Sequence, residues 1–267
     1  MLDLTKHTFL SLDEIKEKAN SIFASKGAES TSEKYSHIPT YKVIEDMALL
    51  GWSVTDVKEV KARKGIGFQK HLVVFRNNDI VINGADGDNV FPQILLTNSS
   101  DGKNAFTFQC SIFRMVCENG LVISTQDFAK LRIRHMGYKF EQLQNTISSI
   151  IEMLPLTVES MNKMKGIELV ESQIIDLAKQ ALTVRFGEEE MNRITIDYTE
   201  FIKATRVEDD GNDLWRVFNR IQEKVIEGDF EYRFSTKTRK ARRIKNFQQD
   251  MKVNIGLWEL TEKFCLN

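Results

Sequence analysis

The sequence predicts an α+β protein, with a twisted antiparallel sheet core over about residues 40–136 followed by a mostly helical C-terminal half. Three observations support this prediction. Apolar and polar side chains alternate over residues 106–112, which gives a strand one buried and one solvated face. Asn-Gly and Asp-Gly dipeptides at residues 83–84, 101–102 and 119–120 can supply the positive φ angles that tight hairpins require. After His135 the apolar residues instead recur at helical spacing.

The first 36 residues are expected to lie outside the main domain. They hold a helix-like pattern around Leu12 and Ile15, followed by a polar run at 25–36 that is typical of a flexible link. We therefore expect an N-terminal helix and link over 1–36 and a single domain over 37–267, sheet-rich at 37–140 and helical at 141–267. In the sheet, Phe106, Phe108, Cys110 and Ile112 are expected to face the core, and Thr107, Gln109 and Ser111 the solvent.

The helical half contains a series of apolar patterns. A first helix is expected at about residues 143–154, and Pro155 should end it because proline lacks the backbone N–H that a helix interior needs. Further helices are expected at about 169–182, 191–202, 214–225 and 247–258.

Motifs give little support for catalysis. Cys110, Cys117 and Cys265 lack zinc-ligand spacing, and the four histidines have no neighbouring nucleophile motif. A buried cysteine at a strand end explains Cys117 better than a nucleophile does. The Gly-Ile-Gly segment at 65–67 lacks the further glycine and the Lys-Ser/Thr pair of a phosphate-binding loop, and indicates a hairpin or a strand kink. We expect no enzyme activity, no metal and no cofactor.

The chain is also expected to stay in a reduced, aqueous compartment. No stretch approaches the length of an apolar membrane span, and the first residues lack the pattern of a secretory signal. We therefore expect a cytoplasmic protein with no membrane partner.

Charge is distributed very unevenly along the chain. With 37 Lys+Arg against 38 Asp+Glu the formal net charge is −1, but residues 231–267 carry nine basic and four acidic side chains, and residues 185–213 carry four and nine. Six cations fall within residues 237–245: Lys237, Arg239, Lys240, Arg242, Arg243 and Lys245. Such a run is typical of a surface that contacts phosphate backbones. The alternatives are a solvated basic helix start and an intramolecular partner for the acidic segment.

Two more basic stretches lie in the sheet half. They comprise Lys58, Lys61, Arg63, Lys64 and Lys70, and then Lys130, Arg132, Arg134 and Lys139. In a strand, Arg132 and Arg134 would point to the same face, opposite Ile133. The aromatic residues Tyr138 and Phe140 lie beside these cations, and such residues either stack on unpaired bases or pack in the core. The predicted nucleic-acid-binding residues are Arg63, Lys64, Lys70, Arg132, Arg134, Tyr138, Lys139, Lys237, Arg239, Lys240, Arg242, Arg243 and Lys245.

Several short motifs resemble a known family. They are Arg-Met-Val-Cys-Glu-Asn-Gly-Leu at 114–121, Arg-Ile-Arg-His at 132–135 and Leu-Trp-Arg-Val-Phe-Asn at 214–219. Their order and spacing are similar to those of a phage/plasmid-like family catalogued as a domain of unknown function, over residues 38–265. The chain departs from it by having Phe218 where tyrosine is usual, and by a longer basic insertion before the last helix. The motif residues, whose role the resemblance does not give, are Arg114, Cys117, Asn119, Gly120, His135, Trp215 and Asn219.

The resemblance implies a viral or mobile-element origin and work in the cytoplasm of a bacterial host. Together with the charge pattern, it favours a non-enzymatic single-stranded DNA-binding protein that acts as a cofactor in phage transcription or replication, with a phage RNA polymerase or replication protein as a further partner. One alternative is a phage protein that binds and inhibits a host defence protein or nuclease, the acidic segment 185–213 mimicking nucleic acid. A second is an unrecognised nuclease. Assembly into a homo-oligomer is left open.

Overall fold

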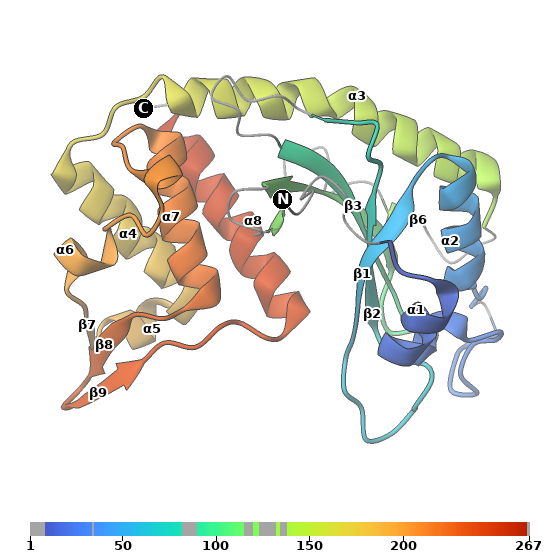
Figure 1. The fold of residues 1–267 in the computed structure, drawn as a ribbon. Coiled ribbons are helices and arrows are strands. Elements are labelled where there is room, and N and C mark those ends of the chain that lie inside the picture. Colours follow the sequence, from blue (N-terminus) through green and yellow to red (C-terminus); the bar gives the residue numbers. More distant parts are fainter. Residues whose placement is uncertain are drawn as a thin grey trace. The chain divides into compact units, whose positions relative to one another are not determined.

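The computed structural model describes residues 9–33, 35–81, 90–114, 120–122, 132–133 and 138–265 (Figure 1). It divides into two compact units, Met1–Leu154 and Pro155–Asn267, in place of the single domain expected over 37–267. The helix α3 (Phe140–Lys165) contains the boundary, so no loop marks it in the sequence.

Unit 1 is built on an antiparallel sheet. Its strands are β1 (Ser53–Glu59), β2 (His71–Arg76), β3 (Val90–Asn98), β4 (Phe106–Arg114), β5 (Gly120–Val122) and β6 (Arg132–Ile133). The first five follow one another in the order of the chain, and β6 pairs with β4. Register brings Val73 opposite Leu96 and Ile94 opposite Cys110. The sheet predicted for the N-terminal half is therefore confirmed.

Helices cover one face of this sheet: α1 (Leu12–Lys18), the 3₁₀ helix η1 (Asn20–Phe23), α2 (Thr40–Leu49) and the first part of α3. Ile15 and Met47 are buried in one core cluster with Phe75, Phe108 and Ile147 of the sheet and of α3. The N-terminal helix expected to lie apart from the domain is thus part of its core.

The alternation predicted for residues 106–112 holds on the core side. Phe106, Phe108 and Cys110 are buried, and Thr107 is partly exposed. Ser111 is buried rather than solvated. Strand β2, two strands away, is likewise buried along its whole length, so the second face of the sheet is also covered at these positions.

A buried polar network joins the helices to the start of β2. His71 is fully buried, and its Nδ1 and Nε2 atoms lie 2.8 Å from Ser21 Oγ and 2.9 Å from Thr40 Oγ1. Burial lowers the pKa of His71 to about 4, because a charged imidazole would lose its hydration. Glu59, at the end of β1, accepts hydrogen bonds from Ser21 N (2.7 Å) and Gln69 Nε2 (3.3 Å). The network therefore fixes both ends of the loop between β1 and β2.

Unit 2 combines three long helices, α4, α7 and α8, with several short helices and a small sheet. The elements after α3 are α4 (Glu171–Phe186), α5 (Glu188–Met191), β7 (Ile194–Thr195), α6 (Tyr198–Phe201), η3 (Val207–Asp209), α7 (Leu214–Glu227), β8 (Glu231–Phe234), β9 (Lys237–Lys240) and α8 (Phe247–Phe264). Helices α4, α7 and α8 contact one another, and Phe218 packs edge-on against Trp258 with ring centroids 6.0 Å apart. The sheet has the order β7-β8-β9 and is antiparallel.

Two local features differ from the sequence predictions. Helix α3 continues through Pro155, because Leu154 and Met161 on either side are both buried and hold the helix against its neighbours. The segment 191–202 is not one helix, since Ile194 pairs with β8 and Asp197 caps the separate helix α6. The basic run begins as strand β9, which excludes one of its alternatives, the start of a basic helix. Among the described residues no helix is long and apolar enough to cross a membrane.

Candidate nucleic-acid interface

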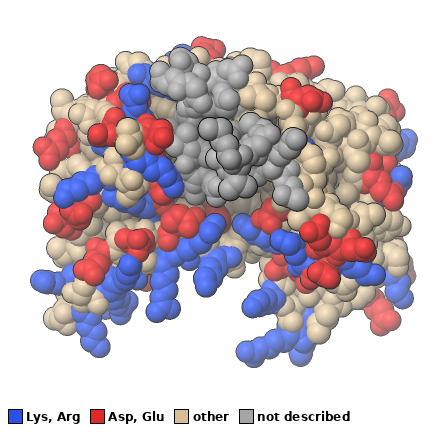
Figure 2. Space-filling model, viewed as in Figure 1, with Lys and Arg blue, Asp and Glu red and all other residues tan. Residues whose placement is uncertain are grey.

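The basic run of unit 2 forms an exposed β-hairpin. Glu231–Phe234 and Lys237–Lys240 pair with each other, and Ser235, in the turn, has a φ of 54°. Every residue of β9 is exposed, and so are Arg242, Arg243 and Lys245 beyond it. Figure 2 shows Lys and Arg side chains gathered over this part of the unit. We call residues 231–245 the basic hairpin.

Only two of the six predicted cations have a carboxylate partner within the described ranges. Lys240 pairs with Asp229 (2.5 Å) and Arg243 with Glu227 (3.3 Å). Both acids lie just before the hairpin, so these ion pairs do not join the basic run to the acidic segment 185–213. The other four cations carry no ion pair with any described residue: Lys237, Arg239, Arg242 and Lys245. The basic hairpin therefore keeps most of its positive charge exposed.

Two guanidinium groups lie against one aromatic ring on this surface. The central carbons of Arg193 and Arg239 lie over the ring of Phe234, at 4.4 and 4.3 Å from its centroid. Such contacts attract a cation to the ring electrostatically, and they restrain both arginine side chains. A guanidinium group also has N–H donors in a fork that matches the oxygens of a phosphate. Exposed Arg233 adds a further cation to the same hairpin.

Sequence reasoning missed Arg193, Arg233 and Phe234. The hairpin register, which places Tyr232 opposite Arg239 and Phe234 opposite Lys237, was not visible because the basic run does not alternate with apolar residues. The Tyr-Arg-Phe sequence of β8 was the one local signal of a strand. Arg193 comes from a distant segment, and only the pairing of β7 with β8 brings it to Phe234.

Backbone contacts fix the base of the basic hairpin. Asp229 N donates to Ala241 O (3.1 Å), Ala241 N to Phe230 O (2.8 Å) and Ile244 N to Ile226 O (2.9 Å). Gly228, with a φ of 81°, ends α7 at this point, and a Cβ atom there would lie 2.8 Å from Ala241 O. Glycine is required both for the left-handed backbone and for the close approach.

Arg185 ties the hairpin to the helices. It donates to the carbonyl oxygen of Val225 near the end of α7, and to Arg242 O at 2.6 Å. Its guanidinium also lies 5.7 Å from the centroid of the Phe230 ring. Burial lowers the pKa of Arg185. Arg185 therefore fixes the backbone segment that carries Arg242, and we do not count it among the cations that can contact a ligand.

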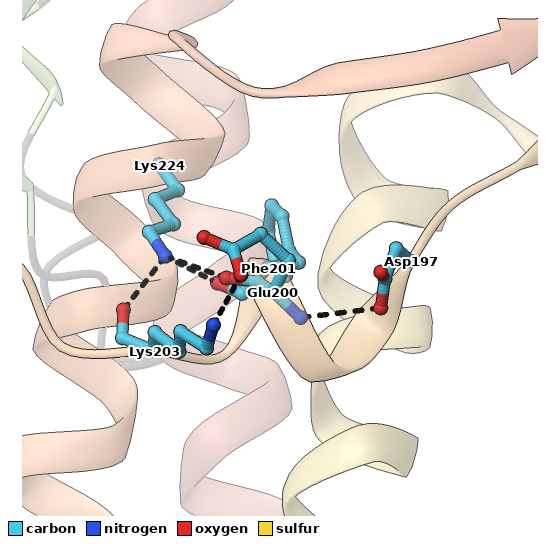
Figure 3. A network of polar contacts seen from close by, with 5 residues as sticks. All are labelled: Asp197, Glu200, Phe201, Lys203 and Lys224. Carbon is cyan, nitrogen blue, oxygen red and sulfur yellow. Dashed lines mark hydrogen bonds and ion pairs between the residues drawn. The ribbon is translucent and has the colours of Figure 1, made fainter.

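A second set of contacts supports the hairpin from α6 (Figure 3). Lys224 Nζ donates to the carbonyl oxygens of Phe201 (2.6 Å), Lys203 (2.7 Å) and Glu200 (3.4 Å), which closes the C-terminal end of this short helix. Asp197 accepts from Glu200 N at the other end (3.2 Å), and Lys203 pairs with the Glu200 carboxylate. The helix thereby holds Phe201, whose ring packs edge-on against that of Phe230 at 4.9 Å, directly before β8.

Unit 1 has an exposed basic loop of its own, between β1 and β2. We call residues 60–70 the β1–β2 loop. Lys61, Arg63 and Lys64 are exposed and form no ion pair with any described residue, whereas Lys70 is half-buried and burial lowers its pKa. The loop is closed by Val60 N, which donates to Lys70 O at 2.9 Å. Of the cations predicted here, Arg63 and Lys64 are therefore exposed and Lys70 is partly exposed.

The third predicted group, around residues 130–140, is described only in part. Arg132 begins β6, and Arg134 lies outside the described residues. Lys139 is exposed. Tyr138 is half-buried against the core of unit 1, and its hydroxyl donates to Asp46 Oδ2 at 2.7 Å, which together with burial raises its pKa. Because this ring already packs in the core, we leave it out of the proposed contact surface.

The comparison with known proteins decides the family. The model of the family described as Domain of unknown function (DUF932) matches residues 28–258, which is most of the chain. The chain belongs to this family. Two relatives from Escherichia coli (strain K12), UPF0380 protein YfjQ and UPF0380 protein YafZ, are each 29% identical over 259 residues, covering 95% of this chain and 90% of theirs. No solved structure matches it. The resemblance to a family defined as a domain of unknown function is confirmed, whereas a phage or plasmid origin stays a prediction. The matched part of this DUF932 chain contains both the basic hairpin and the β1–β2 loop.

The family-motif residues divide into two groups in this DUF932 chain. Trp215 and Asn219 lie one turn apart on α7, both buried, and Asn219 Nδ2 donates to Trp215 O at 2.7 Å. They serve the packing of that helix. Arg114 ends β4 and Gly120 begins β5, where it pairs with Phe113. Cys117, Asn119 and His135 lie outside the described residues.

Neither a metal-binding cluster nor a reactive thiol at Cys110 is found in the described parts of the chain. No group of three or more His, Cys, Asp or Glu side chains lies close enough there to hold a metal ion. Cys110 is fully buried, and burial raises its pKa to about 12, so this thiol stays protonated and unreactive at neutral pH.

Proposed function

We propose that the protein is a non-enzymatic, single-stranded DNA-binding protein that neutralises phosphate charge with the basic hairpin. The observation that carries the proposal is the exposure of Lys237, Arg239, Arg242 and Lys245 without carboxylate partners among the described residues. Exposed unpaired cations at this density attract polyanions, because binding releases the counterions condensed on the phosphates.

The stacking of Arg193 and Arg239 on Phe234 supports a single strand as the ligand. The Phe234 ring restrains both guanidinium groups, and a guanidinium group can bind phosphate through two parallel hydrogen bonds. Interleaved cations and aromatic rings are the usual surface of proteins that bind single strands with little sequence preference. A role as cofactor of a phage RNA polymerase or replication protein, in the cytoplasm of a bacterial host, completes the proposal.

Oligonucleotide binding measured at two salt concentrations tests the proposal. A fluorescein-labelled 30-nucleotide single strand and the matching duplex are titrated with the full chain at two salt concentrations, and anisotropy is recorded. We expect tighter binding of the single strand and an affinity that falls steeply with salt. Replacing Lys237, Arg239, Arg242 and Lys245 with Ala should lower the slope of log K against log salt by about 3, at roughly 0.7 per phosphate contact.

A matched variant controls for net charge. It changes to Ala four exposed lysines that lie on helices, and so removes the same charge: Lys16, Lys18, Lys163 and Lys252. This control should keep the slope of the unmodified protein. Equal slopes for the two quadruple variants, or no binding of the single strand at low salt, would refute the proposal.

One observation favours a second candidate, a protein that inhibits a host defence protein or nuclease. Glu188, Glu189 and Glu190 on α5 are all exposed and have no ion pair with any part of the chain that the structure describes. Such a surface could imitate a phosphate backbone. A strong inhibition of nuclease activity by a protein that fails to bind the oligonucleotide would favour this candidate.

A further inference from the structure

A large apolar side chain projects from the tip of the β1–β2 loop. Ile66 is 72% exposed and lies between Gly65 and Gly67, whose φ angles are 68° and 91°. Residues with a side chain rarely adopt such backbone angles. The two glycines therefore allow a backbone conformation here that would be strained with other residues. Apart from the adjoining residues, no heavy atom of the described residues lies within 4 Å of the position that a Cβ would take on either glycine. The tip therefore stands clear of the described part of unit 1.

The surroundings of Ile66 distinguish it from an ordinary exposed aliphatic residue. Lys61, Arg63 and Lys64 precede it within five residues, are exposed and have no carboxylate partner in the described chain. An apolar tip next to unpaired cations matches a ligand that alternates negative charge with flat apolar surface. A nucleic-acid strand has this composition, because every nucleotide carries a charged phosphate and a base with a flat apolar face.

The stem presents this tip in a defined position. Phe68 N donates to Gly65 O (3.1 Å), which closes a tight turn around Ile66, and Ser100 N donates to Phe68 O (3.2 Å). Gln69 bridges the loop to the buried network, because its side chain accepts from Gly67 N and donates to Glu59 (3.3 Å). A fixed apolar tip can enter a stack of bases without first ordering its own backbone.

We propose that Ile66 is a wedge that inserts between adjacent bases of a bound strand, while Lys61, Arg63 and Lys64 contact the flanking phosphates. Aliphatic side chains act in this way in proteins that kink or unstack nucleic acids. The inference rests on the proposed function, since it takes the same ligand, but it concerns a separate surface in unit 1 and a different kind of contact. It assigns to the Gly-Ile-Gly segment an apolar contact with bases rather than a contact with phosphate.

Base unstacking gives a direct readout. Single strands carrying 2-aminopurine at one internal position are titrated with the full chain, and fluorescence is recorded, which rises when the probe base loses its stacked neighbours. We expect an increase with the unmodified protein and its loss in Ile66→Ser. Affinity in Ile66→Ser should fall roughly three- to tenfold, the range expected when part of an aliphatic side chain is no longer buried on binding. The salt slope should not change, because no charge is removed. Ile66→Phe keeps a large apolar side chain at this position, so this variant should show the fluorescence increase and the affinity of the unmodified protein.

Leu49→Ser is the matched control. Leu49 is 76% exposed in the same unit, at the end of α2, and its change should leave fluorescence and affinity as they were. An Ile66→Ser protein that behaves like Leu49→Ser would overturn the wedge while leaving the proposed function standing. Absence of any binding by the unmodified protein would instead refute the proposed function itself.

An anionic membrane is the other ligand that could take a basic loop with an apolar tip. Sedimentation with vesicles of phosphatidylserine and phosphatidylcholine, compared with phosphatidylcholine alone, tests it. We expect no co-sedimentation. Binding to the anionic vesicles that Ile66→Ser abolishes, with oligonucleotide binding unaffected by the same change, would overturn the wedge in favour of a lipid contact.

Discussion

Buried His71 should make unit 1 sensitive to mild acid. The imidazole titrates near pH 6.5 in an unfolded chain, whereas burial lowers its pKa to about 4 in the folded protein. Below pH 6.5 the unfolded state therefore binds a proton that the folded state does not, and stability falls as the pH falls. The loss should reach about 2 kcal/mol at pH 5 and about 3 kcal/mol near pH 4, since each pH unit between the two pKa values costs about 1.4 kcal/mol.

Urea unfolding measured by circular dichroism between pH 7.5 and 4.5 tests this expectation, together with the titration of the His71 ring protons by NMR. The comparison is His71→Gln, which keeps an amide able to reach Ser21 or Thr40 but removes the titrating group. The variant should be less stable at neutral pH and should lose less stability over the acid range. Other groups near His71, namely Glu59 and His37, are present in both proteins and cancel in the difference. Parallel pH profiles, or an NMR pKa above 6, would refute the reasoning.

Three further predictions concern the hairpin and the core. Gly228→Ala should lower the free energy of unfolding in urea by more than about 2 kcal/mol, because it adds a close contact with the backbone to an unfavourable φ. Gly187→Ala, with a φ of 84° and no described atom near the added Cβ, should lower it by about 1 kcal/mol. Equal losses in the two variants would contradict the close contact. Asp229→Asn should raise the affinity for a single strand two- to threefold and steepen the salt slope by about 0.7, because it removes the ion pair of Lys240. Asparagine also tolerates the positive φ of this position. An unchanged slope would place Lys240 outside the contact surface. Cys110 should resist a thiol reagent in the folded protein and react after unfolding, and rapid reaction in the native state would contradict its burial.

The sequence predicted the sheet of unit 1 well, because its strands have a strong apolar side. The alternation at residues 106–110 and the turn dipeptide at 101–102 are local signals, and they correspond to strand β4 and to the turn before it. Pro155 shows where local reasoning was wrong. Its missing N–H weakens the helix at one position, but burial of residues on both sides outweighs that loss, and such burial is visible only in three dimensions.

The candidate site was predicted as charge but not as geometry. The density of Lys and Arg at 237–245 could be read directly, yet the sequence could not tell which cations are neutralised. Asp229 and Glu227 approach Lys240 and Arg243 only because the chain turns back at Ser235 and β8 pairs with β9. Arg193 lies more than 40 residues before Phe234, and no local pattern links them.

The stacking of arginines on Phe234 has a consequence for how equal charges contribute to binding. A free lysine or arginine side chain loses about 0.5 to 1.5 kcal/mol of rotational freedom when a ligand immobilises it. Arg239 is already restrained by the ring in the unbound protein, so this entropic cost falls on folding and not on association. Lys237 lies next to it on a flexible aliphatic stem and has no such restraint among the described contacts. Two neighbouring side chains of the same charge are thus pre-ordered to different degrees, and the arginine can hold a phosphate at a lower entropic cost than the lysine beside it.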